Sequence, residues 1–158
     1  MQRTFRVVVN RTDERRIAGP EDIDRLCADL AARPVFTADV LGEHGYNGPT
    51  LDLIVETGRA TIFYMDMDRG IKLGSRDEAC IRRGSVSLRN DAYPELELDQ
   101  VEVHWRDIIP LERALTILRR YLATGEVVDL VSWPSEDEQE LGDDGVAPDP
   151  TGEEEIPF

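Results

Sequence analysis

The chain opens with alternating apolar and polar positions, a pattern typical of a half-buried β-strand. Within residues 4–10, Phe5, Val7 and Val9 fall on one side and polar residues fall on the other. A period of two, carried mainly by β-branched residues, predicts a strand over this segment. The polar residues 10–16 that follow predict a turn.

A first amphipathic helix is predicted between Pro20 and Pro34. Pro20 is followed by two acids, and both residue types suit the first turn of a helix. Apolar residues then recur at the i, i+3, i+4 and i+7 positions that make one helical stripe. The stripe consists of Ile23, Leu26, Cys27 and Leu30.

The middle of the chain predicts the centre of a sheet. Residues 35–41 favour a strand, and residues 42–49, which contain three glycines and an Asn-Gly-Pro turn, predict a loop. Residues 51–56 and 60–65 predict a hairpin that turns at Gly58. Because its second strand is apolar on both faces, we expect that strand to lie in mid-sheet with both faces covered.

Weaker patterns follow the hairpin. Residues 70–73 and 85–89 predict two short strands, with a charged turn at 75–78 between them. In residues 96–105 the apolar positions change from even to odd numbers. Strand side chains repeat every two residues, so this change predicts a bulge or turn near Asp99.

The clearest helix begins at Pro110 and is predicted to stop at Gly125. A last short strand is predicted over residues 127–133. Together these elements predict the α+β class: one domain over residues 1–133, in which an antiparallel sheet of about five to seven strands packs with two amphipathic helices. The stripe predicted to be buried on this second helix is Leu111, Ala114, Leu115, Leu118 and Leu122.

The net charge of −15 is unevenly distributed. Ten of the 33 acids and none of the 18 bases lie in residues 134–158. This segment has too little apolar content to fold alone, so the sequence predicts an acidic, flexible C-terminal tail. A field of this sign repels nucleic acids and anionic membranes, and it favours a partner with a basic surface.

The cellular location is also constrained. No apolar run of signal-peptide length follows Met1, and no run is long enough to cross a membrane. Cys27 and Cys80 are too few for a disulfide framework in a domain of this size. We therefore expect a soluble cytoplasmic protein with free thiols and no membrane partner.

The motif search gives no positive evidence for catalysis. The chain has no phosphate-binding, dinucleotide-binding or nucleophile-elbow motif, and its histidines and cysteines lack metal-ligand spacing. Residues 66–70 begin like a calcium loop, but the glycine comes one position early, so we expect a hairpin turn. We expect no catalytic residue, no cofactor and no metal. The remote alternative is an enzyme that uses Cys80 as its nucleophile. Arg82 and Arg83 follow this cysteine closely, and such cations can lower the pKa of a thiol.

Acidic turns supply the candidate partner-binding residues. Acids with an aromatic residue nearby suit a partner rich in Arg or Lys, because aromatic rings anchor an interface and charges steer the encounter. Solvated turns are the simpler explanation for any one of these residues. The candidates are Asp66, Asp68, Asp77, Glu78, Asp91, Tyr93 and Glu95.

The C-terminal half carries a recognisable set of motifs. An Ile-Pro-Leu-x-x-Ala segment begins at Ile109, a Tyr-Leu-x-Thr-Gly stop spans residues 121–125, and a short segment ends at Trp133. With the 51–65 hairpin and the Asp66-x-Asp-x-Gly turn after it, this set resembles the Imm1 family of bacterial immunity proteins, over about residues 3–133.

This resemblance implies a function. Imm1 proteins are α+β domains that neutralise a cognate toxin of a polymorphic toxin system, often a nuclease or a nucleic-acid deaminase, by stoichiometric binding and without catalysis. The expected partner is a protein toxin with a basic surface, not a nucleic acid. The alternative is a non-catalytic regulatory or scaffolding module with an acidic tail.

Overall fold

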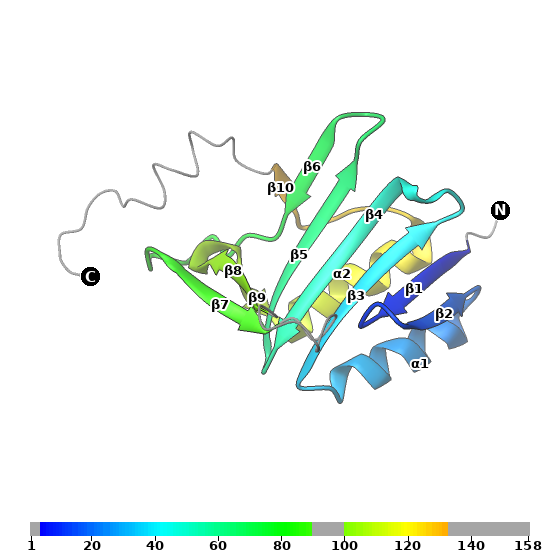
Figure 1. Cartoon of the computed structure of the whole chain (residues 1–158), viewed down its shortest axis with the longest axis horizontal. Helices are drawn as coiled ribbons and strands as arrows, with labels where there is room; N and C mark the ends of the chain where they lie inside the picture. The colour runs from blue at the N-terminus through cyan, green and yellow to red at the C-terminus, as the bar shows by residue number, and fades with distance from the viewer. Residues whose placement is uncertain (1–3, 90–99, 133–158) are drawn as a thin grey trace.

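The computed structural model describes residues 4–89 and 100–132, and it has the α+β architecture expected from the sequence (Figure 1). An eight-stranded antiparallel sheet has both helices on one side, and a separate two-stranded sheet lies at one end. The elements are β1 (Phe5–Val9), β2 (Asp13–Ile17), α1 (Pro20–Ala31), β3 (Val35–Gly42), β4 (Gly45–Glu56), β5 (Arg59–Asp66), β6 (Ile71–Gly74), β7 (Ser85–Arg89), β8 (Gln100–His104), the 3-10 helix η1 (Trp105–Asp107), β9 (Ile109–Pro110), α2 (Leu111–Thr124) and β10 (Val131–Ser132).

The strand order is β10-β6-β5-β4-β3-β1-β2, and β9 pairs separately with β5. The predicted hairpin, now β4 and β5, therefore lies near the middle of the sheet, as expected. The sheet has more strands than the predicted five to seven, because β2, β9 and β10 are short strands whose residues carry little hydrophobic periodicity. The hairpin of β7 and β8 forms the second sheet.

The core lies between the helices and one face of the large sheet. The four-residue stripe predicted on α1 is buried, as expected. On α2 the stripe is rotated from the prediction: Ile117 and Tyr121 are buried, and Leu111 and Leu115 only partly so. The Tyr121 ring lies 5.1 Å from that of Phe5 and 5.9 Å from that of Tyr64, centroid to centroid. Tyr121 therefore joins α2 to β1 and β5, which lie on either side of the central strands β3 and β4.

The predicted turn over residues 10–16 is confirmed only for residues 10–12, because residues 13–17 form the strand β2. The chain reverses at Asn10 and Arg11, which adopt left-handed backbone angles (φ 54° and 66°), and β2 then pairs antiparallel with β1. Strand β2 is an edge strand whose sequence is mostly charged. Charged side chains suit an edge exposed to solvent, but they hide the alternation by which a strand is recognised.

The predicted loop over residues 42–49 is also largely wrong. Strand β3 continues to Gly42, and β4 begins at Gly45, so the turn between them is only two residues long. The pairing register shifts between Leu41 and Gly42, which lets the glycine-rich segment join the sheet. The last strand is shorter than predicted, because only Val131 and Ser132 pair with β6.

The C-terminal end of α2 is confirmed at Gly125. This glycine has a left-handed backbone (φ 77°), and its N–H donates to the Tyr121 carbonyl at 2.7 Å. The phase change predicted near Asp99 falls on residues outside those described. Both cysteines are free, and burial on α1 raises the pKa of the Cys27 thiol. No helix among the described residues has the length and apolarity needed to span a membrane.

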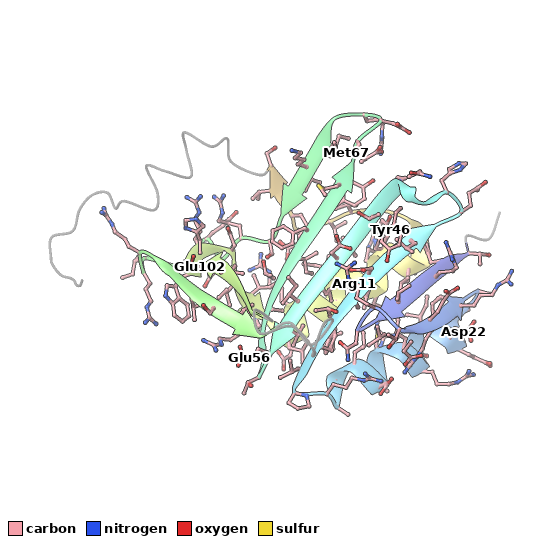
Figure 2. The ribbon with its side chains drawn as sticks, viewed as in Figure 1. Arg11, Asp22, Tyr46, Glu56, Met67 and Glu102 are labelled. Atoms are coloured by element: carbon pink, nitrogen blue, oxygen red, sulfur yellow. The ribbon has the colours of Figure 1, made fainter. Side chains whose placement is uncertain are left out.

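The second face of the large sheet is only partly covered, so the expectation that β5 would be covered on both sides holds at the fully buried Thr61 and fails at the exposed Met65. A small cluster of Leu88, Val103 and Ile108 packs against Ile54 at one end of this face. Further along β5, Phe63 is half-buried and Met65 is 38% exposed. Met67, in the turn after β5, is exposed at the upper edge of the molecule (Figure 2). Among the described residues, the exposed side chain of β5 on this face is Met65, whereas Asp39 and Thr61 on the same face are buried. We call this side of the sheet, opposite the helices, the open face.

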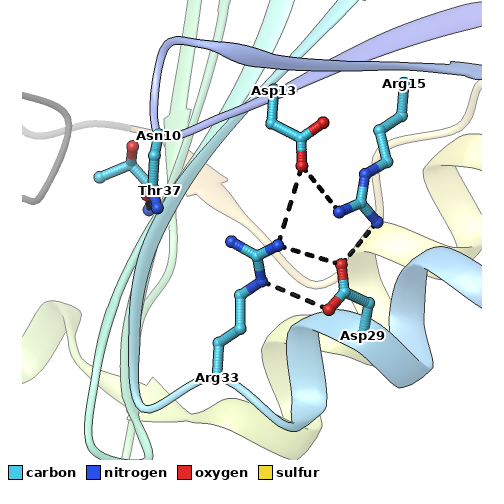
Figure 3. Close-up of polar contacts among 6 residues, drawn as sticks. All are labelled: Asn10, Asp13, Arg15, Asp29, Arg33 and Thr37. Atoms are coloured by element: carbon cyan, nitrogen blue, oxygen red, sulfur yellow. Dashed lines mark hydrogen bonds and ion pairs between the residues drawn. The ribbon is translucent and has the colours of Figure 1, made fainter.

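A network of two aspartates and two arginines joins β2 to the end of α1 (Figure 3). Arg15 lies 2.8 Å from Asp13, and Arg33 donates to both oxygens of Asp29, at 3.2 and 3.4 Å. Arg15 also pairs with Asp29. Hydrogen bonds from Arg33 and Arg15 lower the pKa of the Asp29 carboxyl. The network gives the charged edge strand a defined partner on the helix.

Replacing Asp29 with Asn is expected to lower the free energy of unfolding by about 1 kcal/mol at pH 7, the upper range for partly exposed pairs. Because the folded-state pKa of Asp29 is depressed, its contribution is present above pH 4 and is lost as the pH falls. Urea unfolding at pH 7 and pH 3 should show the difference only at pH 7. Glu43→Gln, in the exposed β3–β4 turn, is the control; an equal loss there would contradict the role of the network.

Candidate functional site

The structure does not bring the sequence-predicted acidic residues into one cluster. Asp66 and Asp68 lie at the β5–β6 turn, whereas Asp77 and Glu78 follow the other end of β6. These four candidates therefore form two separate acidic pairs, one at each end of β6. The remaining candidates, Asp91, Tyr93 and Glu95, lie outside the described residues.

Two of these acids stabilise the turns in which they lie. Asp66 is only 4% exposed, and its carboxylate accepts hydrogen bonds from the Arg69 side chain at 2.6 Å and the Arg69 backbone at 3.4 Å. The Arg69 guanidinium lowers the pKa of Asp66. Asp77 accepts from the Ala79 N–H at 3.1 Å. Asp68 and Glu78 are exposed, and their contact with a partner stays a prediction.

The sheet register instead brings a different set of residues together on the open face. Asp39 on β3 lies directly opposite Asp52 on β4, and Asp52 lies opposite Phe63 on β5. Strand side chains alternate between faces, so these residues point away from the buried Ala38, Val40, Leu51 and Leu53 that face the helices. Asp39, Asp52 and Phe63 therefore form a row across three neighbouring strands of the open face.

Asp39 is the residue that organises this face. It is 7% exposed, and its Oδ2 accepts a hydrogen bond from the Tyr46 hydroxyl at 3.2 Å. The Nε atom of Arg11 lies 3.6 Å from the same oxygen. Tyr46 is nevertheless 59% exposed, and Figure 2 shows Arg11 and Tyr46 in front of β3 and β4, on the side away from the helices. The contact fixes the hydroxyl of an exposed aromatic ring.

The turn that carries Arg11 is attached to β3. Asn10 exchanges two hydrogen bonds with Thr37: its N–H donates to the Thr37 carbonyl, and its side-chain oxygen accepts from the Thr37 N–H, both at 2.9 Å. Figure 3 shows both residues at the point where the β1–β2 turn meets β3. Arg11 is therefore held on the β1–β2 turn, within reach of Asp39.

Asp52 has an unusual protonation behaviour. Its pKa is raised from 3.8 to about 7, first because it is buried and second because the Asp39 carboxylate lies beside it; Arg11 opposes the shift. Like charges directly opposite each other in a sheet are destabilising. Near neutral pH Asp52 is therefore only partly ionised, because its pKa lies close to 7. We define Arg11, Asp39, Tyr46, Asp52 and Met65 as the open-face surface.

Sequence reasoning did not single out any member of the open-face surface. The available signal was polar residues at alternate positions of apolar strands, since Asp39 and Asp52 each interrupt a run of buried residues. Whether two such residues meet depends on register, and the irregularity at Gly42 shifts the register here. Tyr46 was assigned to a loop, so its position beside Asp39 could not be anticipated.

Neither a metal centre nor a relative identifies this site. Among residues 4–89 and 100–132, no group of three or more His, Cys, Asp or Glu side chains is placed to hold a metal ion. Comparison of the chain with protein-family models and with curated proteins found no match. The features that bear on function are therefore the geometry of the open face and the motifs in the sequence.

Proposed function

We propose that this chain is an immunity protein, which binds a cognate protein toxin and neutralises it stoichiometrically. The proposal names a nuclease or nucleic-acid deaminase as the toxin and assigns no catalytic step to the chain. The observation that carries it is the exposed Tyr46 ring, whose hydroxyl is held by Asp39 beside a carboxyl pair on the open face.

This arrangement suits an interface with a basic protein. Exposed aromatic residues on rigid strands are frequent anchors of protein interfaces, and Tyr46 is attached to β3 through Asp39. Met65, on β5 opposite Thr50 of β4, adds a flexible apolar side chain that can adapt to a partner. Enzymes that bind nucleic acid present basic clefts to phosphates, so a carboxyl pair is complementary to them.

The C-terminal elements lend further support. The Ile-Pro dipeptide of the motif forms β9, the helix α2 follows it and stops at Gly125, and β10 comes next. This is the strand, helix, glycine and strand order that the resemblance to Imm1 proteins implies. This order of elements supports the proposal at the level of the fold. The groups that would contact the toxin are those of the open-face surface.

Co-expression tests the proposal directly. Bacteria that express the toxin encoded beside this gene are expected to survive only when the full chain is produced with it. The chain and an inactive variant of that toxin should also elute as a 1:1 complex in size-exclusion chromatography. If the chain neither rescues the bacteria nor forms a complex with the toxin, the proposal is overturned. Binding to a different neighbouring protein without rescue would favour the regulatory or scaffolding alternative.

A further inference from the structure

A second feature lies away from the open-face surface, where η1 meets the β4–β5 turn. A cavity of about 350 Å³ is lined there by Arg59, Asp77, Cys80, Arg82, Trp105 and Ile108, among others. The guanidinium carbon of Arg82 lies 3.8 Å from the centre of the Trp105 ring, and that of Arg59 lies 5.8 Å from it. Two cations therefore share one aromatic ring at the wall of a cavity.

The cavity has an excess of positive charge. The ion pairs that the described residues form with one another involve other arginines, and neither Arg59 nor Arg82 takes part in them. Asp77, the acid in the wall, accepts a hydrogen bond from the Ala79 backbone. An anion that carries apolar groups would match the two guanidinium groups beside Trp105 and Ile108.

We propose that this cavity is a carboxylate-binding site whose occupant is the chain's own acidic C-terminal segment, residues 134–158. The segment has ten acids and no Lys or Arg, and it ends in Glu-Glu-Glu-Ile-Pro-Phe. Its carboxylates complement Arg59 and Arg82, and its terminal apolar residues complement Trp105 and Ile108. The inference is independent of the proposed function, because it uses none of the open-face surface.

The topology places the start of this segment close to the cavity. Strand β10 ends at Ser132 and pairs with Leu73 and Gly74 on β6. Ser132 lies opposite Leu73, and Asp77 follows Leu73 by four residues, so the Cα atoms of Leu73 and Asp77 are at most about 14 Å apart. Twenty-six residues extend beyond Ser132, far more than that distance requires.

Attachment to the same chain also favours this occupant over a separate anion. A nucleic acid or an acidic partner must approach a protein whose net charge is −15, and the long-range repulsion slows that encounter. A segment tethered by a short linker has an effective concentration in the millimolar range, so its encounter with the cavity does not require approach from bulk solution. The chain's own acids are therefore the anions that reach the two arginines most readily.

A nitroxide placed on the segment tests the proposal in the full chain. The label is attached at Thr151→Cys in a background of Cys27→Ala and Cys80→Ser, and the indole N–H signal of Trp105 is followed by NMR. We expect this signal to lose more than half of its intensity relative to the reduced label. It should recover at about 1 M salt, where the Debye length is about 3 Å. An unchanged Trp105 signal intensity would overturn the proposal.

Matched variants separate the arginines from general proximity. Arg59→Gln with Arg82→Gln should abolish the broadening, whereas Arg25→Gln, an exposed charge on α1, should preserve it. Unchanged broadening in the double variant would overturn the role of the arginines. If that variant does not fold, neutralising Glu153, Glu154 and Glu155 to Gln applies the same test. A Trp105 signal that responds to inorganic phosphate but not to the nitroxide would assign the cavity to a small anion and overturn the proposal.

Discussion

Replacing Asp52 with Asn is expected to stabilise the protein at pH 8 by roughly 4 kcal/mol. The folded-state pKa of Asp52 is about 7, well above the 3.8 of an unperturbed carboxyl, and each unit of difference corresponds to about 1.36 kcal/mol. Above pH 7 the wild-type protein must hold two negative carboxylates side by side. Asparagine has nearly the same shape, can donate a hydrogen bond to Asp39, and carries no charge.

The sign of the pH dependence follows from the direction of the shift. Because the folded protein binds the Asp52 proton more tightly than the unfolded chain does, the stabilising contribution is complete below pH 4 and is lost as the pH rises through 7. Urea unfolding should therefore show the Asp52→Asn gain at pH 8 and almost none at pH 4. An equal gain at both pH values would contradict this account. Asp68→Asn, in the exposed β5–β6 turn, is the control and should change stability little.

The predicted gain bears on why an aspartate occupies this position. A residue that destabilises the fold at neutral pH is more readily explained by function than by packing. If a basic partner binds the open-face surface, it supplies the charge that allows Asp52 to ionise, and one proton is released. The same Asp52→Asn variant should then bind the toxin more weakly at pH 8 although it is more stable. Stability and binding would change in opposite directions.

Much of the fold followed from the periodicity of apolar residues. The first strand, both helices and the central hairpin were predictable because each presents a clear apolar stripe or alternation to one shared core. Strands β2 and β10 were not predicted well, since an edge strand can be charged or very short and still pair through its backbone. Gly42 and Gly45 were assigned to a loop because glycine usually marks one, yet here they belong to paired strands.

The candidate site was less predictable than the fold. Acidic residues in turns drew attention in the sequence, but Asp66 and Asp77 turned out to hold their own backbone. The open-face surface instead combines three strands and one turn, and Asp39 meets Asp52 only through the register of β3 with β4. Sequence patterns describe which face a strand residue occupies, whereas they leave open which residue lies across from it.

Replacing Tyr46 with Ala is expected to weaken toxin binding by at least thirtyfold, or about 2 kcal/mol, as for the anchor residue of an interface. The ring is 59% exposed in the free protein, so its removal should leave the free energy of unfolding nearly unchanged. Titration calorimetry with an inactive toxin gives the dissociation constant, and urea unfolding gives the stability. Ile81→Ala removes another large apolar side chain, 96% exposed and away from the open face, and should leave binding unchanged.

Tyr46→Phe separates the ring from the hydroxyl. Phenylalanine keeps the aromatic surface but loses the 3.2 Å hydrogen bond to Asp39, so the ring is no longer held over the carboxyl pair. If Asp39 positions the anchor, this variant should bind with an affinity between those of the wild type and Tyr46→Ala. Wild-type affinity in Tyr46→Phe would mean that the ring alone anchors the partner. Wild-type affinity in Tyr46→Ala would remove the open-face surface from the interface, and the exposed acids Asp68 and Glu78 would then be the next residues to test.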